Sequence, residues 1–164
     1  MEYLQVFNNK REMLNEKVPR KEKFNLKDGK YFMIILLFIE NSNGEFLIQK
    51  TSKEKRSVNA TTGGHVSYGD DGLKTVIKES KEELGLKLDV NELEFVDSIY
   101  ENNCIIEIYY VKRDIDINGL VIQKEEVEYV KWYSVDKIME LIDNNDFRET
   151  NIEPFKLVLK NKKD

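Results

Sequence analysis

Hydrophobic positions along the chain fall into short runs separated by polar turns, and this pattern predicts mostly strands. The longest run, residues 31–39, is apolar or aromatic at every position, which is typical of a strand buried on both faces. A polar turn over 41–44 and a second strand over 45–50 follow, so we expect a hairpin. Further strands are predicted over residues 3–7, 93–100, 105–112 and 127–133.

A helix is predicted over residues 72–84. Its apolar positions gather on one arc when residues are spaced by about 100°, and this face is expected to dock on the sheet. The face comprises Leu73, Val76, Ile77, Ser80 and Leu84. Gly85 follows at the position where helices commonly end in a left-handed backbone conformation.

Two shorter helices are expected near the C-terminal end. Ser134 is a suitable N-cap for a helix over 135–142. A last helix is expected to begin near Pro154 and to present one apolar face, formed by Phe155, Val158 and Leu159. The charged segment 8–30 predicts no element. Strands outnumber helices, so the fold class expected is α/β in the wider α+β sense: a mixed sheet with helices packed on it, in a single domain.

Composition narrows the class of protein further. A chain of 164 residues suits one domain, and 40% hydrophobic with 35% charged residues excludes a wholly disordered chain. No apolar run approaches the roughly 20 residues of a membrane span, and no signal peptide pattern opens the sequence. The lone Cys104 suits a reducing compartment, so we expect a cytoplasmic protein without a membrane partner. A net charge of −5 disfavours a nucleic acid polymer as partner.

The most informative pattern in the sequence is a group of acidic residues at helical spacing. Glu79, Glu82 and Glu83 occupy positions i, i+3 and i+4 of the predicted helix over 72–84. Like charges at these spacings cost roughly 0.2–0.5 kcal/mol per pair, and the second half of a helix already disfavours negative charge. A hard divalent cation such as Mg²⁺, held by carboxylates and substrate phosphates, would relieve this repulsion. The alternative of a solvated acidic face remains open.

The spacing of these residues resembles the Nudix box, whose family pattern is Gly-x5-Glu-x7-Arg-Glu-U-x-Glu-Glu-x-Gly-U, with U a bulky aliphatic residue. In this chain the box spans residues 64–86, and the matching positions are Gly64, Glu79, Glu82, Glu83, Gly85 and Leu86. Asp70 and Lys78 replace the family's Glu and Arg, and Ser80 departs at an aliphatic position. The flanking segments 41–50 and 125–142 also resemble Nudix domains, particularly the subgroup similar to isopentenyl-diphosphate isomerase.

The resemblance implies a Nudix-type α-β-α sandwich, with residues 1–164 forming a single Nudix hydrolase domain. It implies hydrolysis of a diphosphate bond in a nucleoside diphosphate linked to another moiety, by attack of water on phosphorus. The implied cofactor is Mg²⁺, with Mn²⁺ as a substitute, and the implied partner is a small-molecule nucleotide or diphosphate substrate. The chain is expected to be a monomer or a homodimer, and the sequence does not distinguish the two.

The family's metal ligands carry over to the acidic helix. The resemblance implies that Glu79, Glu82 and Glu83 are catalytic metal ligands, with Glu79 also the preferred acceptor of a proton from the attacking water. A backbone carbonyl of Gly63 or Gly64 would supply a further ligand. The family's bracing pair, which fixes the loop against the helix, corresponds to Asp70 and Lys78. This pair is shorter and lacks the bidentate fork of arginine.

Some family members place a further glutamate after the box, as a ligand or base. The candidates are Glu125, Glu126 and Glu128, with Glu126 preferred as a catalytic residue. Solvated charges near the start of a strand are the alternative, and both interpretations stay open.

Three other features have a functional and a structural interpretation. His65 is a possible base, but a structural role is favoured. Cys104 is expected to pack as a small apolar side chain rather than to act as a nucleophile. A cluster of basic residues can steer a polyphosphate, although a solvated loop is the simpler interpretation. Its members are Lys50, Lys53, Lys55 and Arg56.

Two other functions remain possible. An isomerase of isopentenyl diphosphate needs a cysteine directly before the Gly-His pair, where this chain has Gly63. A non-catalytic module that senses a nucleotide is the second, but nothing would then maintain three repelling glutamates. The substrate itself is not predicted, because the loops 51–60 and 113–124 spell out no base, sugar or acyl carrier.

Overall fold

The computed structural model describes residues 1–54 and 56–162. Its strands are β1 (Tyr3–Phe7), β2 (Met13–Pro19), β3 (Phe32–Glu40), β4 (Phe46–Thr51), β5 (Thr62–His65), β6 (Glu94–Glu101), β7 (Cys104–Lys112) and β8 (Val127–Tyr133). Its α-helices are α1 (Gly72–Leu84), α2 (Val135–Asp143) and α3 (Ile152–Asn161). Short 3-10 helices are η1 (Arg20–Asn25), η2 (Val90–Glu92), η3 (Ile117–Gly119) and η4 (Glu149–Asn151). Among the described residues, no helix is long and apolar enough to cross a membrane.

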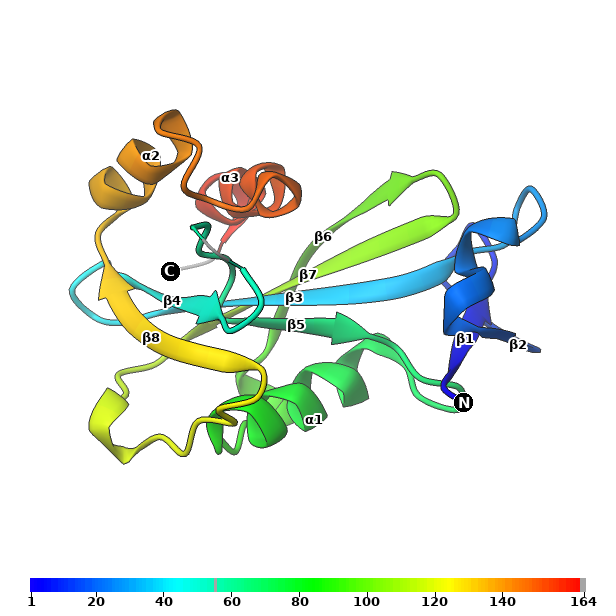
Figure 1. Ribbon diagram of the computed structural model, residues 1–164, viewed down its shortest axis with the longest axis horizontal. Coiled ribbons are helices and arrows are strands. Elements are labelled where there is room, and N and C mark those ends of the chain that lie inside the picture. Colours follow the sequence, from blue (N-terminus) through cyan, green and yellow to red (C-terminus); the bar gives the residue numbers. More distant parts are fainter. Residues whose placement is uncertain (55, 163–164) are drawn as a thin grey trace.

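A six-stranded mixed sheet forms the centre of the molecule. Its order is β6-β7-β3-β4-β8, with β5 paired to β3, and only β3 and β7 run parallel. Helix α1 lies on one side of this sheet, and α2 and α3 lie on the other (Figure 1). The predicted single-domain mixed sheet and α-β-α sandwich are therefore confirmed.

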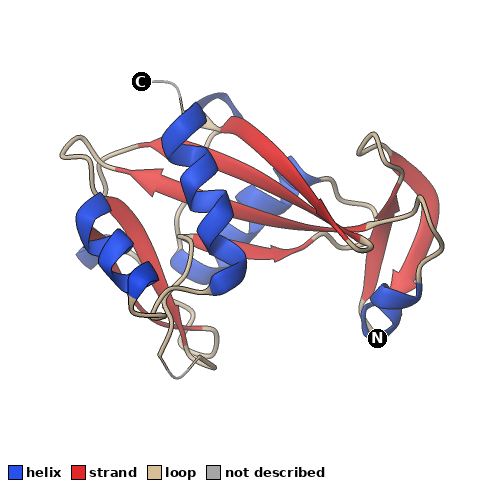
Figure 2. Cartoon of the chain, turned by 90° about the horizontal axis from the view of Figure 1, so that it is seen from above, coloured by secondary structure: helices blue, strands red, loops and turns tan. Residues whose placement is uncertain are grey.

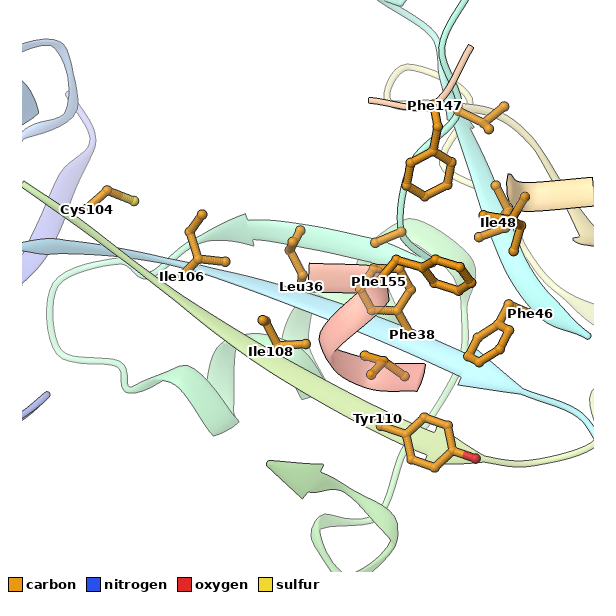
Figure 3. Packing of buried hydrophobic residues seen from close by; sticks show 14 of the residues in the cluster. Leu36, Phe38, Phe46, Ile48, Cys104, Ile106, Ile108, Tyr110, Phe147 and Phe155 are labelled. Carbon is orange, nitrogen blue, oxygen red and sulfur yellow. The ribbon is translucent and has the colours of Figure 1, made fainter. Parts of the chain in front are cut away.

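Strand β3 holds the two layers together because both of its faces are buried, as its apolar run predicts. Ile35 and Leu37 pack into the hydrophobic cluster beneath α1, together with Val76 of that helix. Phe38, on the opposite face, packs against Phe155 of α3, with the two ring centroids 5.7 Å apart (Figure 3).

The predicted hairpin of β3 and β4 forms only at its turn. The two strands pair at Glu40 and Phe46, and β3 then pairs with β5 along residues 34–37 instead. Strand β4 continues away from this edge to pair with β8. The sheet is therefore split between β4 and β5.

The segment 8–30, for which no element was predicted, contains β2 and η1. Strand β2 is mostly exposed, so its sequence lacks the regular apolar positions that would indicate a strand. It pairs with β1, whose Leu4 and Val6 lie in the same hydrophobic cluster as Phe32 of β3. These strands and η1 extend from one end of the sandwich (Figure 2).

Helix α1 has the ends that its sequence predicts. The Asp71 side chain accepts a hydrogen bond from the backbone N–H of Lys74 at 2.8 Å, and Gly85 adopts a left-handed conformation with φ of 63°. Val76, Ser80 and Leu84 are fully buried on the docking face. The last helix, α3, begins at Ile152, two residues before Pro154.

Candidate active site

One large cavity, of about 780 Å³, opens beside the split in the sheet. Its lining residues come mainly from strands β3, β4, β5 and β7, from helices α1 and η1, and from residues 148–151 in and just before η4. The apolar floor includes Leu36, Cys104 and Ile106, which lie in a row on the sheet face that continues toward Phe155 (Figure 3). A cavity of this size suits a small-molecule ligand, since such sites typically measure about 300–1,000 Å³.

Four carboxylates line one end of this cavity. Glu79, Glu82 and Glu83 project from α1, and Glu126 approaches from the loop before β8. The side chain of Glu82 is exposed, whereas Glu79 and Glu83 are half-buried. The structure thus brings these four predicted residues together.

The other two acidic candidates before β8 have different surroundings. Glu125 is exposed and is not part of the cavity lining. Glu128 lies 3.6 Å from the ammonium group of Lys50, and it does not line the cavity either.

Strands β4 and β5 fix Glu83 and leave no space beside Glu79. The Thr62 hydroxyl donates to the Oε1 atom of Glu83 at 2.5 Å, and the Gln49 amide donates to the same oxygen at 3.2 Å. A Cβ atom on Gly64 would lie 2.9 Å from Cδ of Glu79. Any side chain at position 64 would therefore displace this glutamate.

Crowding of the carboxylates changes their acidity. Burial, followed by the charges of Glu83 and Glu82, raises the pKa of Glu79 to about 7. Burial also raises the pKa of Glu83, although the hydrogen bonds from Thr62 and Gln49 act in the opposite direction. The charge of Glu126 adds to the increase in the pKa of Glu83. The cluster therefore holds excess negative charge that the protein itself does not neutralise.

The chemistry of this donor set fits a hard divalent cation. Carboxylate oxygens are the ligands that Mg²⁺ prefers, and a cation among them would remove the repulsion that raises the pKa of Glu79. Over residues 1–54 and 56–162, no three His, Cys, Asp or Glu side chains form a group that could by itself hold a metal ion. Further ligands would come from backbone carbonyls, water or substrate, and Gly63 and Gly64 line the cavity beside the cluster.

The predicted bracing pair is present but long. The Lys78 ammonium lies 3.9 Å from Oδ2 of Asp70, and both side chains are partly exposed. This contact joins the loop before α1 to the helix. An exposed pair at this distance contributes about 0–1 kcal/mol.

A second part of the cavity lining, around His65, is basic, which sequence analysis did not predict. Arg20 and Lys23 of η1 belong to it, together with Arg148 from the segment before η4. No sequence pattern indicated them, because η1 itself was not predicted and position 148 lies far along the chain.

His65 lies among these cations and also lines the cavity, so that a structural role for it stays a prediction. Its ring stacks on Phe32 with centroids 5.8 Å apart, and Nε2 lies 2.8 Å from the Lys23 ammonium. Burial, followed by the charges of Arg20 and Lys23, lowers the pKa of His65 to about 3. The imidazole is therefore neutral at pH 7 and accepts a hydrogen bond from Lys23.

The basic cluster singled out in the sequence lies elsewhere. Lys50 is buried and donates to backbone carbonyls, including that of Thr51 at 3.0 Å. Arg56 pairs with Asp146 at 2.6 Å. Lys53 is exposed and outside the cavity lining, and Lys55 lies outside the described residues. Of these residues, Lys50, Lys53 and Arg56 are therefore not part of the cavity lining.

Comparison with known proteins gives consistent matches. Residues 30–154 match the family model described as NUDIX domain. An uncharacterized Nudix hydrolase of Listeria innocua, lin0387, is 26% identical over 151 residues, covering 90% of this chain and 88% of the relative. Nudix hydrolase 3 of Arabidopsis thaliana is 30% identical over 138 residues, which is 73% of this chain and 18% of that protein.

Solved structures show the same fold. DR0079 from Deinococcus radiodurans matches with a TM-score of 0.74 at 16% identity, covering 99% of this chain and 100% of that one. An Ap4A hydrolase of C. elegans matches with a TM-score of 0.54 at 18% identity, covering 77% and 96% of the two chains. The agreement with DR0079 extends over β1, β2 and η1 as well as the central sheet.

Proposed function

Because the chain belongs to the NUDIX domain family and is a hydrolase of diphosphate bonds, we propose that its substrate is a nucleoside diphosphate linked to another moiety. Hydrolysis would proceed by attack of water on phosphorus and would depend on Mg²⁺, with Mn²⁺ as a substitute. The observation that supports this proposal is the convergence of four carboxylates at one end of a cavity large enough for a nucleotide.

Each carboxylate has a role in the proposal. Glu79, Glu82 and Glu83 would hold the cation, together with a carbonyl of Gly63 or Gly64. When bound, the cation would neutralise charge on the diphosphate and make a water molecule more acidic. The hydrogen bonds from Thr62 and Gln49 keep Glu83 directed into the site. Phosphoryl transfer depends mainly on such positioning and charge neutralisation.

A carboxylate must also accept the proton of the attacking water. Glu79 is our first candidate and Glu126 our second, since both line the cavity and neither is held in an ion pair within the described residues. Asp70 and Lys78 would brace the loop that joins β5, which carries Gly63 and Gly64, to α1.

We also propose that the Nudix domain takes in residues 1–164, because Leu4 and Val6 of β1 share a hydrophobic cluster with β3. The similarity to isomerase-like Nudix proteins stays a prediction, since the matched relatives are named as hydrolases. A small-molecule substrate and a cytoplasmic monomer or homodimer remain part of the proposal.

The most direct test is Glu82→Gln. Glu82 is exposed, so its replacement is not expected to disturb packing. Purified protein is assayed with Mg²⁺ against nucleotide sugars, dinucleoside polyphosphates, ADP-ribose, NADH and CoA. We expect Glu82→Gln to lower kcat at least 100-fold for any compound that the unmodified chain hydrolyses, and EDTA to abolish turnover until Mg²⁺ is restored.

Glu125→Gln is the matched control, because it removes an exposed carboxylate one residue from Glu126 and outside the cavity. Glu125→Gln should retain the kcat of the unmodified chain within twofold. In ¹⁸O-water, the reaction of the unmodified chain should introduce ¹⁸O into a phosphate product. Undiminished turnover in Glu82→Gln would overturn the assignment of the acidic cluster. A lack of turnover with every compound would overturn the proposed substrate class.

A further inference from the structure

The basic end of the cavity is built largely from residues that the family match does not include. Arg20 and Lys23 lie in η1, before the matched region 30–154, and Arg148 lies near its end. All three line the cavity that also holds the acidic cluster. They come from separate parts of the chain, so their convergence is a property of the fold rather than of a local charged run.

These cations are only partly neutralised by the protein. Arg20 pairs with Glu2 at 3.0 Å. Lys23 contacts the neutral imidazole of His65 at 2.8 Å and lies 5.1 Å from the ring centre of Phe32. Within the described residues, neither Lys23 nor Arg148 has a carboxylate within ion-pair distance.

Two carboxylates, Glu2 and Glu101, also line the cavity outside the acidic cluster, and Glu2 is the one bound to Arg20. Three cations therefore face two carboxylates in this part of the lining. The acidic cluster, by contrast, has only Lys78 to offset four carboxylates. The cavity lining thus contains a negative cluster, a positive cluster and an apolar floor.

We propose that the basic end, formed by Arg20, Lys23 and Arg148, binds a second anionic group of the substrate, a phosphate or a carboxylate separate from the diphosphate that is cleaved. This inference rests on the proposed function, since it places the scissile diphosphate at the acidic cluster. The substrate would therefore span the cavity with an anionic group at each end.

The chemistry of the lining favours an anion at this end. Lys23 is partly buried, whereas Arg20 and Arg148 are exposed. A partly buried cation without a counter-ion gains from a charged oxygen acceptor, and such hydrogen bonds are stronger than neutral ones. A guanidinium presents a fork of donors that matches phosphate or carboxylate. The volume of about 780 Å³ also exceeds what a diphosphate alone would fill.

A binding experiment without metal tests this end alone. Inorganic phosphate is titrated in EDTA at constant ionic strength by calorimetry. We expect the double variant Lys23→Gln/Arg148→Gln to bind phosphate at least tenfold more weakly than the unmodified chain. Lys21→Gln is the matched control, because Lys21 is an exposed cation of the same helix outside the cavity lining. It should bind phosphate within twofold of the unmodified chain.

Kinetics with matched substrates tests the same end during turnover and distinguishes the two anions. CoA and dephospho-CoA differ by one phosphate, and UDP-glucuronate and UDP-glucose differ by one carboxylate. In at least one pair we expect kcat/KM to be at least tenfold higher for the more anionic member. The double variant should reduce this ratio at least fivefold, and Lys21→Gln should preserve it.

The outcomes separate the two proposals. Equal phosphate binding by the unmodified chain and the double variant overturns the basic subsite, as does a kcat/KM ratio near one in both pairs. If none of the compounds assayed for the proposed function, both pairs included, is hydrolysed while phosphate binding still depends on Lys23 and Arg148, the proposed function fails and the anion site stands. Glu82→Gln should retain phosphate binding, since the subsite lies at the other end of the cavity.

Discussion

At the scale of single residues, burial determines whether Cys104 can react. The thiol lines the cavity floor, and burial raises its pKa to about 12. The thiolate is the reactive form, so at pH 8 its population should be about a thousandfold below that of a free cysteine. We expect iodoacetamide to modify native Cys104 at least 100-fold more slowly than the guanidinium-unfolded chain, as followed by mass spectrometry.

The pH dependence of the modification rate tests whether the raised pKa of Cys104 is the cause of its slow reaction. The raised pKa of Cys104 lies above the pH range of the experiment. The rate at which iodoacetamide modifies the native chain should therefore rise about tenfold per pH unit between pH 7 and pH 10. A rate that levels off near pH 9 would show that the thiol has an ordinary pKa, and the interpretation of Cys104 as an inert packing residue would then be wrong.

Ser80 illustrates a buried polar group with nothing to bind. Its side chain is fully buried, and its Oγ atom has no hydrogen-bond partner among the described residues. No hydrogen bond therefore compensates, among the described residues, for this departure from the box. Ser80→Ala should raise the free energy of unfolding by about 1 kcal/mol, because it removes an unsatisfied hydroxyl and improves helix propensity.

Urea unfolding measures this change in the free energy of unfolding. Ser134→Ala is the control for which a change in the opposite direction is expected. The Ser134 side chain accepts a hydrogen bond from the backbone N–H of Lys137 at 3.1 Å at the start of α2, so its removal should cost about 1 kcal/mol. Destabilisation by Ser80→Ala would mean that the hydroxyl has a partner, such as a bound water.

At the scale of elements, the end of α1 depends on Gly85. Its φ of 63° disfavours a side chain, and a Cβ atom there would lie 2.8 Å from Cβ of Val121. Gly85→Ala should therefore combine backbone strain with a steric clash, and we expect a loss of about 2–3 kcal/mol in the free energy of unfolding.

Gly29→Ala separates these two causes. Gly29 has a φ of 84°, but a Cβ atom there would meet nothing within 4 Å, so only the strain should remain. We expect a loss of about 1 kcal/mol in urea unfolding for this control. Equal losses in the two variants would contradict a clash with Val121.

The elements also show what local sequence determines. The apolar run 31–39 and the helical pattern 72–84 were predicted almost to their observed ends, because the first is continuously apolar and the second has helical periodicity. Strand β2 and helix η1 were not predicted, since β2 is mostly exposed and both depend on pairing with β1 and packing at the end of the sheet.

The same distinction applies to the candidate site. The three helical glutamates were predicted because their spacing within one helix brings them to one face, and Glu126 followed from the family resemblance. Arg148 meets Arg20 and Lys23 of η1 only through tertiary packing, which no pattern along the chain encodes. The acidic residues that lie on one helix were therefore predictable from the sequence, and the cations that distant segments bring to the cavity were not.

At the scale of the whole molecule, the N-terminal strands belong to the main core. Leu4 is fully buried, lies in one hydrophobic cluster with Phe32 and Phe155, and sits on the strand that pairs with β2. This continuity predicts a single cooperative unfolding transition, in which the N-terminal strands and the central sheet unfold together.

Leu4→Ala tests this coupling, since truncating a fully buried leucine should cost about 3 kcal/mol. Trp132 lies in β8, in the central sheet, so its fluorescence reports on unfolding away from the substitution. We expect the Trp132 transition and the far-ultraviolet circular dichroism transition to shift together to lower urea. Val90→Ala, at a side chain that is 50% exposed in η2, should shift neither by more than about 0.5 kcal/mol. If Leu4→Ala left the Trp132 transition in place while circular dichroism showed an earlier loss, β1 and β2 would form a separate unit, and η1 would hold Arg20 and Lys23 over the cavity only loosely.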